Sequence, residues 1–518
     1  MSVIQKISNL TRVEKWSDIF TDGAAALSLS NLFFLKTWQE IVFAAPEERF
    51  YLKTPAPADY YAVLLNVLFL GILIFFLFRT YRKSHTGCVK KPAAVLFVGI
   101  LLVPLNAFRN LSPALSIPRL AETFGDRGLI AGAVLLLLLA AGLSVRYHRS
   151  FIHGLSVVLL VLSSFSLLTF SQAAWSLVNW KPLNNPSDFI ISGGKDVSNN
   201  RVLWLVFDEL DQRMTFEEHP LDVKTPELDR LLRQSLFATQ AFAPGEETIV
   251  SMPALITGRK VVEAQPAGPE EILLTFENQE KPVPWSRQPG IFSRLDDLGY
   301  KTAVVGCYLP YDRVIGHHVT TCFWQPFGTT GIKGDSGIIK TMKGQVFSAL
   351  ALSPFNNRYH ARDVFQSLLK HAKQIVVNPE YKLILVHMTI PHYPWIYDRE
   401  QEDFTLTNFD LDKGYYDNLV LVDLTINRLR LAMEKSGTWE NTHVIVTSDH
   451  PWRMERFPVY DREFDPRIPF VLQVAGQEEP LNIDYPFNTV ITTDLILALV
   501  QGQLSTPEEV KRWIRMNR

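Results

Sequence analysis

The chain has 518 residues, of which 47% are hydrophobic, and a formal net charge of -2. That length is enough for a membrane part plus one large globular domain. The near-neutral charge, with no dense run of Lys and Arg in the C-terminal part, excludes a strongly basic nucleic-acid-binding protein, so we expect no nucleic-acid partner.

The N-terminal third of the chain is predicted to be a transmembrane domain of four to five helices over residues 1–180. Residues 61–78, 93–108, 128–145 and 152–177 each have roughly the apolar length that crosses a bilayer core. Residues 24–45 are interrupted by Lys36 and Glu40, so this stretch either spans the membrane or lies in its interface as an amphipathic helix. Residues 1–19 are polar and mixed, which predicts no cleavable signal.

Basic residues in the short loops predict the orientation, because cytoplasmic loops are enriched in Lys and Arg. The loop after residues 61–78 contains five of them, and the loop after residues 128–145 contains Arg146 and Arg149. Both loops are therefore expected on the cytoplasmic side. The chain then leaves the last span on the outer side, and its C-terminal domain faces the periplasm or the cell exterior.

Cys307 and Cys322 both fall in this exported part. In an oxidising compartment we expect them to form a disulfide, the alternative being two buried free thiols. The sequence has no Cys-x-x-Cys pattern, so a structural zinc site of that kind is not expected.

Residues 181–200, rich in Asn, Pro, Ser and Gly, are predicted to be a linker, and residues 201–518 a single α/β domain. Apolar strands alternating with helical patterns predict a largely parallel sheet with right-handed crossovers. The expected strands are residues 202–207, 302–305, 382–387, 443–448 and 469–474. The expected helices are residues 226–234, 290–298, 360–375 and 416–435.

Polar side chains follow two of these strands directly. The strand at 202–207 ends in Asp208-Glu209, and the strand at 443–448 ends in Asp449-His450. Functional groups of open α/β sheets gather at the carboxyl ends of the strands. Carboxylate oxygens together with an imidazole nitrogen suit Zn²⁺ or Mn²⁺ better than Ca²⁺. The sequence therefore predicts a site for one divalent metal, held by one or both of the adjacent acids together with Asp449 and His450.

Thr248 lies between these segments, just before a predicted helix. Coordination to a metal and the positive end of that helix would ionise its hydroxyl and make it a nucleophile. The structural alternative is that Thr248 is only the N-cap of the helix.

These segments resemble the sulfatase-like branch of the alkaline-phosphatase superfamily. The resemblance is strongest in Leu205 to Glu209, Thr248 to Pro253 and Ser448 to His450. Several spans followed by an exported domain are similar in layout to the membrane-anchored phosphoethanolamine transferases and lipoteichoic acid synthases.

The resemblance implies roles for individual residues. Glu209 takes the place of the primary metal ligand and Asp208 that of the first of two acids in sulfatases, with Asp449, His450 and Thr248 completing the metal site. Thr248 takes the place of the nucleophile. His387 and His392 resemble histidines that line the pocket and touch the substrate, although either can instead be a satisfied buried histidine. The helix containing Asp417 and Asp423 is assigned to packing.

The resemblance also implies an activity. A bacterial inner-membrane enzyme would transfer a phospholipid headgroup phosphate, phosphoethanolamine or phosphoglycerol, through a covalent phospho-threonine to a glycan or lipid acceptor of the cell envelope. Two alternatives remain, namely a phosphoric ester hydrolase of the same fold and a non-catalytic lipid-sensing membrane protein.

The chain departs from the family patterns in three respects. Thr248 lacks the Cys/Ser-x-Pro-x-Arg context that formylglycine formation requires, which disfavours sulfate ester hydrolysis. No histidine follows His450, which favours one main metal over a two-zinc site. Pro451 stands where many relatives have glycine after the Asp-His pair.

Overall fold

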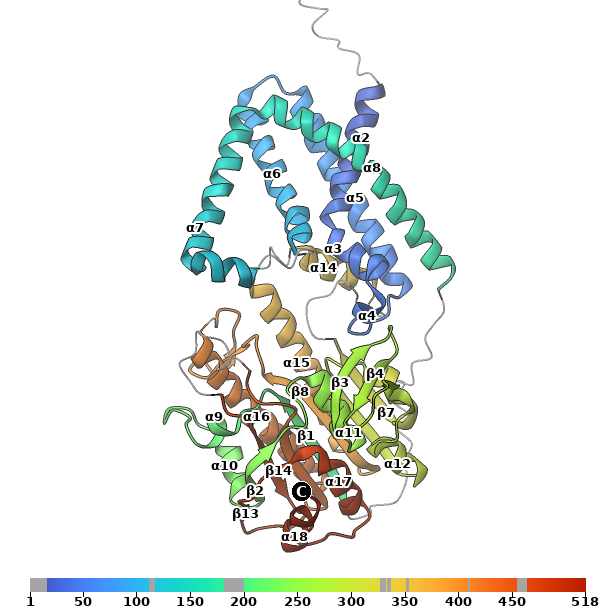
Figure 1. Ribbon diagram of the computed structural model, residues 1–518. Coiled ribbons are helices and arrows are strands. Elements are labelled where there is room, and N and C mark those ends of the chain that lie inside the picture. The colour runs from blue at the N-terminus through green and yellow to red at the C-terminus, as the bar shows by residue number, and fades with distance from the viewer. Residues whose placement is uncertain are drawn as a thin grey trace, which may run out of the picture. The chain divides into compact units, whose positions relative to one another are not determined.

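The computed structural model describes residues 16–110, 117–180, 200–326, 332, 337–350, 354–408, 410–453 and 464–518 (Figure 1). These residues form two compact units, which we call the helical unit and the α/β unit. Two segments depart from a division at residue 180. Residues 45–52 belong to the α/β unit, and residues 337–350 belong to the helical unit.

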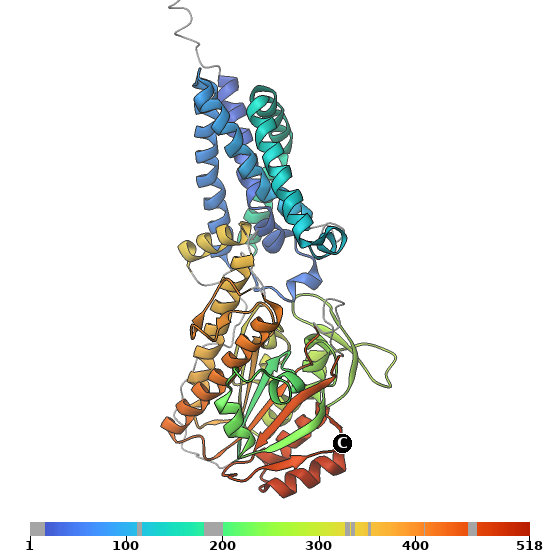
Figure 2. The same ribbon diagram turned by 90° about the vertical axis from the view of Figure 1, so that its left-hand side faces the viewer.

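The helical unit contains long apolar helices that stand side by side (Figure 2). Its helices are α2 (Trp16–Phe33), α3 (Leu35–Trp38), the π-helix η1 (Gln39–Phe43), α5 (Pro57–Lys83), α6 (Gly87–Asn110), α7 (Ile117–Arg146), α8 (His148–Val178) and α14 (Ile338–Ala349). Three of them are long and apolar enough to cross a membrane, judged by length and composition in the described residues: Pro57–Lys83, Gly87–Arg109 and His148–Val178. They contain the predicted spans 61–78, 93–108 and 152–177.

The other two predicted spans do not correspond to such long apolar helices in the described residues. Residues 128–145 fall in α7, whose apolar stretch in the searched part, Ala131–Arg146, is shorter than the three long helices. Residues 24–45 are not one helix, because α2 ends at Phe33 and a short helix and a π-helix follow.

Segment 337–350 joins the helical unit through polar contacts that no hydropathy pattern reveals. The Asn66 side chain in α5 donates hydrogen bonds to the Met342 carbonyl (3.1 Å) and the Gln345 side chain (3.0 Å) of α14. The Gln345 amide in turn donates to the Asp59 carbonyl (2.8 Å).

The α/β unit is built on a nine-stranded sheet in the order β13-β2-β12-β11-β1-β8-β6-β7, with β14 also paired to β2. Its strands are β1 (Arg201–Asp208), β2 (Leu236–Phe242), β6 (Lys301–Cys307), β7 (Thr321–Gln325), β8 (Tyr381–Pro391), β11 (Thr442–Ser448), β12 (Arg467–Gln473), β13 (Leu481–Ile483) and β14 (Phe487–Asn488). Neighbouring strands are parallel except where β12 pairs with β11 and β2. This confirms the predicted α/β fold.

Helices cover both faces of the sheet because the strands are apolar on both sides. Helices α11 (Thr248–Thr257), α12 (Ile291–Asp297), α17 (Thr492–Val500) and α18 (Pro507–Asn517) pack on one face. Helices α9 (Gln212–Phe216), α10 (Pro226–Leu232), α15 (Pro354–Val376) and α16 (Leu411–Ser436) pack on the other. In β1, Trp204 belongs to the first core and Leu205 to the second, as the alternation of a strand requires.

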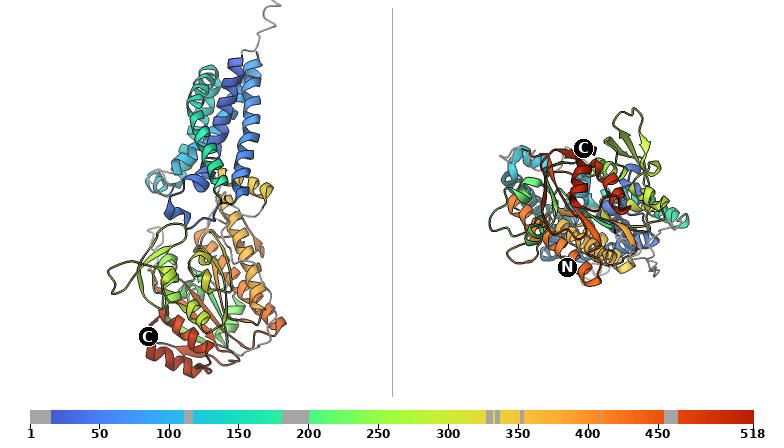
Figure 3. Two further views of the ribbon diagram at one scale, coloured as in Figure 1. Left: turned by 90° about the vertical axis from the view of Figure 1, so that its right-hand side faces the viewer. Right: turned by 90° about the horizontal axis from the view of Figure 1, so that it is seen from below.

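The unit also contains two small sheets and several short helices. The strands β3 (Val261–Pro266), β4 (Ile272–Phe276) and β5 (Val283–Pro284) form an antiparallel sheet that projects from the α/β unit (Figure 3). The strands β9 (Tyr397–Asp398) and β10 (Asp403–Phe404) form a second pair, and α13 (Tyr311–Val314) follows β6.

The predicted disulfide is wrong, because Cys307 and Cys322 are both free and buried. Strands β6 and β7 are parallel neighbours in which Val304 stands opposite Cys322. The two cysteines are therefore three residues out of register, about 10 Å along the strands. Their side chains also pack in the cores on opposite faces of the sheet. A disulfide needs Cα atoms within about 7 Å, so this register excludes one.

Candidate active site

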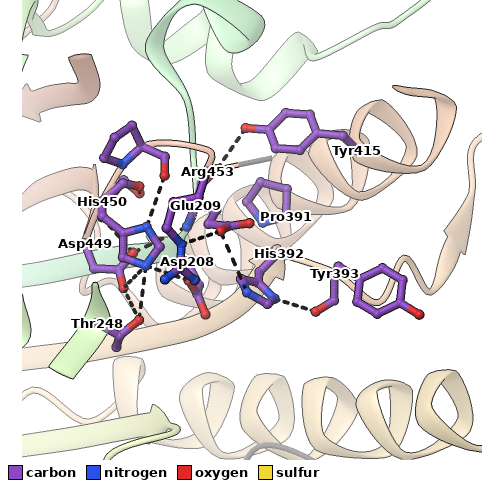
Figure 4. A network of polar contacts seen from close by, with 12 residues as sticks. Asp208, Glu209, Thr248, Pro391, His392, Tyr393, Tyr415, Asp449, His450 and Arg453 are labelled. Carbon is purple, nitrogen blue, oxygen red and sulfur yellow. Dashed lines mark hydrogen bonds and ion pairs between the residues drawn. The ribbon is translucent and has the colours of Figure 1, made fainter. Parts of the chain in front are cut away.

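The carboxyl ends of β1 and β11 bring three predicted residues together. Phe207 and Ser448 are paired in the parallel register, so the residues that follow them emerge at the same edge of the sheet. Asp208, Asp449 and His450 are buried, and each offers one ligand atom within 4.8 Å of the others. Nε2 of His450 lies 3.5 Å from Asp208 Oδ1 and 3.4 Å from Asp449 Oδ2 (Figure 4).

The chemistry of this group suits a cation. The Nδ1 atom of His450 lies 3.1 Å from the Pro451 carbonyl, an acceptor, so Nδ1 carries the proton and Nε2 turns its lone pair toward the two carboxylates. Oδ1 of Asp208 is buried and has no hydrogen-bond partner in the described part of the chain. Acceptor atoms that face one another in a buried site are stabilised by a positive charge between them. The residues therefore fit the predicted divalent metal.

Burial and the neighbouring charged groups also shift the pKa values of the two aspartates. Burial and the neighbouring Asp449 raise the pKa of Asp208 to about 7. Burial also raises the pKa of Asp449, but His450, His387 and the Thr248 hydroxyl outweigh it and hold that pKa below its usual value. A bound cation would favour the ionised form of both acids.

Glu209 occupies a different position from Asp208 because the backbone turns between them. Its φ of 63° is left-handed, which is uncommon for a residue other than glycine. The turn is held by the Tyr415 hydroxyl, which donates to the Glu209 carbonyl (2.9 Å). The buried Glu209 carboxylate accepts a hydrogen bond from Arg453 Nε at 3.0 Å and lies 3.8 Å from His392 Nε2. The structure thus does not bring Glu209 into the Asp-Asp-His group, and its role as a metal ligand stays a prediction.

Thr248 lies against the predicted metal group. Its hydroxyl donates to Asp449 Oδ2 at 2.7 Å and lies 3.3 Å from His450 Nε2. Helix α11 begins at Thr248, its N-cap is Glu247, and the Thr248 hydroxyl is directed at Asp449 rather than at the helix backbone. The N-cap interpretation of Thr248 is therefore wrong.

The two predicted histidines lie in different surroundings. His392 follows an irregularity in the pairing of β1 with β8, and its backbone N–H donates to the Asp208 carbonyl (3.1 Å). Burial lowers the pKa of His392, but Glu209 and Asp208 outweigh it and raise that pKa overall, which favours the imidazolium form. His387 is buried in β8, and burial lowers its pKa to about 4. Its Nε2 lies 3.9 Å from Asp449 Oδ2, and its Nδ1 lies 2.8 Å from the Tyr311 hydroxyl.

A cavity of about 110 Å³, which we call the catalytic cavity, opens beside the metal group. Its lining contains three predicted residues, Asp208, Thr248 and His392, whereas His387 does not line it. The remaining lining residues are Glu247, Ile249, Tyr308 and Arg453.

Arg453 and Tyr308 are site residues that the sequence reasoning missed. The signals for them are weak: Arg453 stands three residues after His450, and Tyr308 directly follows an apolar strand. Arg453 gives the cavity a cation that suits an anionic substrate, and its Glu209 partner raises its pKa further against the opposing effect of burial.

Tyr308 is supported by a segment from the N-terminal third of the chain. The Tyr51 and Tyr308 rings lie 5.0 Å apart. The Arg313 guanidinium donates to the carbonyls of Arg49, Phe50 and Leu52, which fixes the segment 45–52 in the α/β unit. No local pattern predicts this contact, because the partners are more than 250 residues apart in sequence.

The two acids assigned to packing do have structural partners. Asp423 accepts a hydrogen bond from the Leu228 backbone N–H at the start of α10 (2.8 Å). Asp417 accepts from Arg399 (2.7 Å) and from the Asn408 side chain (2.8 Å).

The family model described as Sulfatase matches residues 200–494, more than half of the chain. The chain belongs to the sulfatase family. This confirms the predicted family and the α/β fold of the C-terminal part. A search of curated proteins found no match to this chain.

Solved structures similar to this sulfatase-family chain are distant. The lipoteichoic acid synthase LtaP from Listeria monocytogenes is 15% identical, with 58% of this chain and 72% of that chain covered and a TM-score of 0.38. The PsFucS1 sulfatase from Pseudoalteromonas sp. is 16% identical, with coverages of 59% and 69% and a TM-score of 0.43. A phosphonate monoester hydrolase of Agrobacterium radiobacter is 13% identical, with coverages of 58% and 74% and a TM-score of 0.39.

Proposed function

We propose that this sulfatase-family protein transfers the headgroup phosphate of a phospholipid, phosphoethanolamine or phosphoglycerol, to a hydroxyl of an envelope glycan or lipid acceptor. The reaction passes through a covalent phospho-threonine at Thr248. The observation that supports this most is the position of the Thr248 hydroxyl, which lines the catalytic cavity and contacts Asp449 and His450. Threonine is not a precursor of formylglycine, so the proposed chemistry is phosphoryl rather than sulfate transfer.

Asp208, Asp449 and His450 would hold one divalent cation, Zn²⁺ or Mn²⁺, with Thr248 and the predicted ligand Glu209 as further candidates. When bound, the cation supplies positive charge that polarises a phosphoryl oxygen and lowers the pKa of the threonine hydroxyl.

The residues of the chain account for the movement of protons and bonds. The Thr248 oxygen forms a bond to phosphorus as its proton passes to Asp449 Oδ2, which already accepts the hydrogen bond of this hydroxyl. The bond from phosphorus to the glycerol oxygen breaks, and diacylglycerol leaves with a proton from the His392 imidazolium. An acceptor hydroxyl then attacks phosphorus and gives its proton to His392, while the Thr248 oxygen leaves and regains a proton. Arg453 would bind the phosphate oxygens throughout.

A membrane location suits this chemistry. Within the described part of the chain, three helices are long and apolar enough to span a membrane. A lipid donor would then be confined to the surface where the enzyme is anchored. The basic loops favour an orientation in which the α/β unit faces the periplasm or the cell exterior. The resemblance to membrane-anchored headgroup transferases favours the bacterial inner membrane.

Mass spectrometry of the Thr248 peptide tests the proposal. Full-length protein loaded with Zn²⁺ or Mn²⁺ is incubated with phosphatidylethanolamine or phosphatidylglycerol without an acceptor. We expect a phosphoethanolamine or phosphoglycerol adduct on the peptide that contains Thr248.

Thr248→Ala should abolish the adduct, whereas Ser251→Ala, which removes another hydroxyl of α11 that lines no part of the catalytic cavity, should retain it. No adduct with either donor, while the metal is bound, would contradict the proposal. Release of the free phosphorylated headgroup at the full turnover rate, with an acceptor having no effect, would identify a hydrolase instead.

A further inference from the structure

A second cavity, of about 160 Å³, adjoins the first at His392, which lines both. One wall is the start of α15, from Asn357 to Val364. The other is the segment after the β1–β8 irregularity, including Tyr393 and Pro394. All of these residues belong to the α/β unit.

The two cavities differ in chemistry. The catalytic cavity is lined by carboxylates, the Thr248 hydroxyl and Arg453, which suits a phosphate group. The second is lined mainly by apolar groups, among them Ala361, Val364 and Pro394. An apolar cavity next to a phosphate-binding cavity matches a ligand with one charged and one apolar end.

Side-chain contacts hold one wall of the second cavity in place, and the cavity opens to the protein surface. The buried Arg358 guanidinium lies 5.4 Å from the centre of the Tyr393 ring and donates to the Asn408 carbonyl at 2.8 Å, so Tyr393 is held in position. Tyr393 is 38% exposed and Asn357 is also exposed, so the cavity reaches the protein surface.

The direction of the proposed reaction indicates which part of the donor occupies the second cavity. In an in-line displacement the leaving oxygen departs on the side of phosphorus opposite the attacking oxygen. Figure 4 shows Thr248 and His392 to either side of Asp208, with Tyr393 beyond His392. A group displaced by Thr248 therefore leaves past His392, toward the second cavity.

We propose that this second cavity, which we call the leaving-group pocket, binds the diacylglycerol end of the phospholipid donor. The inference rests on the proposed function. The pocket holds the glycerol esters and the first acyl carbons, while the remainder of the chains passes out beside Tyr393. It thereby determines selectivity for a lipid donor over a water-soluble phosphodiester with the same headgroup.

The test compares two donors with the full-length metal-loaded protein in detergent. Dihexanoyl phosphatidylethanolamine carries acyl chains, and glycerophosphoethanolamine has the same headgroup diester without them. Ala361→Phe fills the pocket, and Gln366→Phe places the same ring on the exposed face of the same helix as a control.

We expect Ala361→Phe to lower kcat/KM for the lipid donor by at least about tenfold, with a change below about twofold for glycerophosphoethanolamine. Val364→Ala, which removes wall contacts without adding bulk, should weaken use of the lipid donor in the same selective way. Gln366→Phe should leave both donors unchanged. An equal loss on both donors in both pocket variants, or no loss on either, would overturn the proposal.

A binding measurement separates failure of the pocket from failure of the proposed function. Dihexanoylglycerol, the lipid product of the proposed first step, should bind the wild-type and Gln366→Phe proteins at least about tenfold more tightly than Ala361→Phe. If neither donor labels Thr248 in wild-type protein, the proposed function fails. Equal dihexanoylglycerol affinities would still overturn the pocket on its own.

Discussion

The Arg453–Glu209 ion pair joins the stability of the site to its binding of anions. Arg453 Nε lies 3.0 Å from Glu209 Oε1, and the Glu209 side chain is 5% exposed. Arg453→Met would leave this buried carboxylate with the His392 imidazole 3.8 Å away. Breaking a fully buried pair costs about 3–5 kcal/mol. Because the Arg453 side chain is 34% exposed, water screens the pair, and we expect a loss of about 1–3 kcal/mol.

Turnover should fall more steeply than stability. Arg453 lines the catalytic cavity, where its guanidinium can bind the phosphate oxygens of the donor. Removing one preorganised charged donor of this kind lowers kcat by roughly 10²–10³-fold. We therefore expect Arg453→Met to lower kcat/KM for the phospholipid donor by about 100-fold.

A double-mutant cycle separates the two effects. Arg453→Met, Glu209→Gln and the double variant are compared by denaturant unfolding of the full chain in detergent and by donor turnover. The double variant should recover about 1–3 kcal/mol of the stability lost by the single variants, because it leaves no unpaired buried charge. It should not recover turnover, because the phosphate still lacks its cation. Arg399→Met, which breaks an ion pair with the buried Asp417 outside the catalytic cavity, is the control that lowers stability without selective loss of turnover.

Two results would refute this reasoning. Full recovery of turnover in the double variant would show that Arg453 acts only by neutralising Glu209. A coupling energy near zero would show that the ion pair contributes nothing. The metal content of Glu209→Gln, measured on the same samples, decides whether Glu209 is also a ligand.

Two further predictions follow from buried carboxylates. Substituting a residue that only supports a metal ligand typically lowers metal affinity by roughly 10–100-fold. Asp208→Asn should lower the Zn²⁺ or Mn²⁺ affinity by more than this, measured by metal titration. An unchanged affinity would remove Asp208 from the ligand set. Burial raises the pKa of Asp423 from its ordinary value near 4 to about 7, so its contribution to folding stability falls as pH rises through that window. Asp423→Asn should therefore gain about 2 kcal/mol over wild type between pH 5 and pH 8, seen as a flatter pH dependence of unfolding, and parallel pH profiles would contradict it.

The sequence predicts well the parts of this molecule that local patterns determine. Largely apolar runs of four to six residues located β1, β6, β8, β11 and β12, because strands buried on both faces are mostly apolar. Asp208, Asp449 and His450, which end two of these strands, lie together, whereas Glu209 does not join this group. Strand β2 was missed because its burial alternates and it lies between polar segments.

Other features depend on register and on distant contacts, which a single sequence does not show. The predicted Cys307–Cys322 disulfide is wrong because the two cysteines are offset by three residues on neighbouring parallel strands. The contact of Tyr51 with Tyr308 crosses the predicted boundary between membrane and exported parts. The separate positions of Asp208 and Glu209 depend on one left-handed residue that neither composition nor spacing indicates.

That left-handed turn gives the site two chemically different sides. Because Asp208 and Glu209 are adjacent, a regular strand would direct them to opposite faces of the sheet. The turn instead keeps both near the catalytic cavity, with Asp208 beside Asp449 and His450 and Glu209 beside Arg453 and His392. Thr248 contacts the first group, and the leaving-group pocket adjoins the second at His392. An in-line displacement needs a nucleophile on one side of phosphorus and a proton donor on the other, and this pair of acids organises both sides from a single strand end.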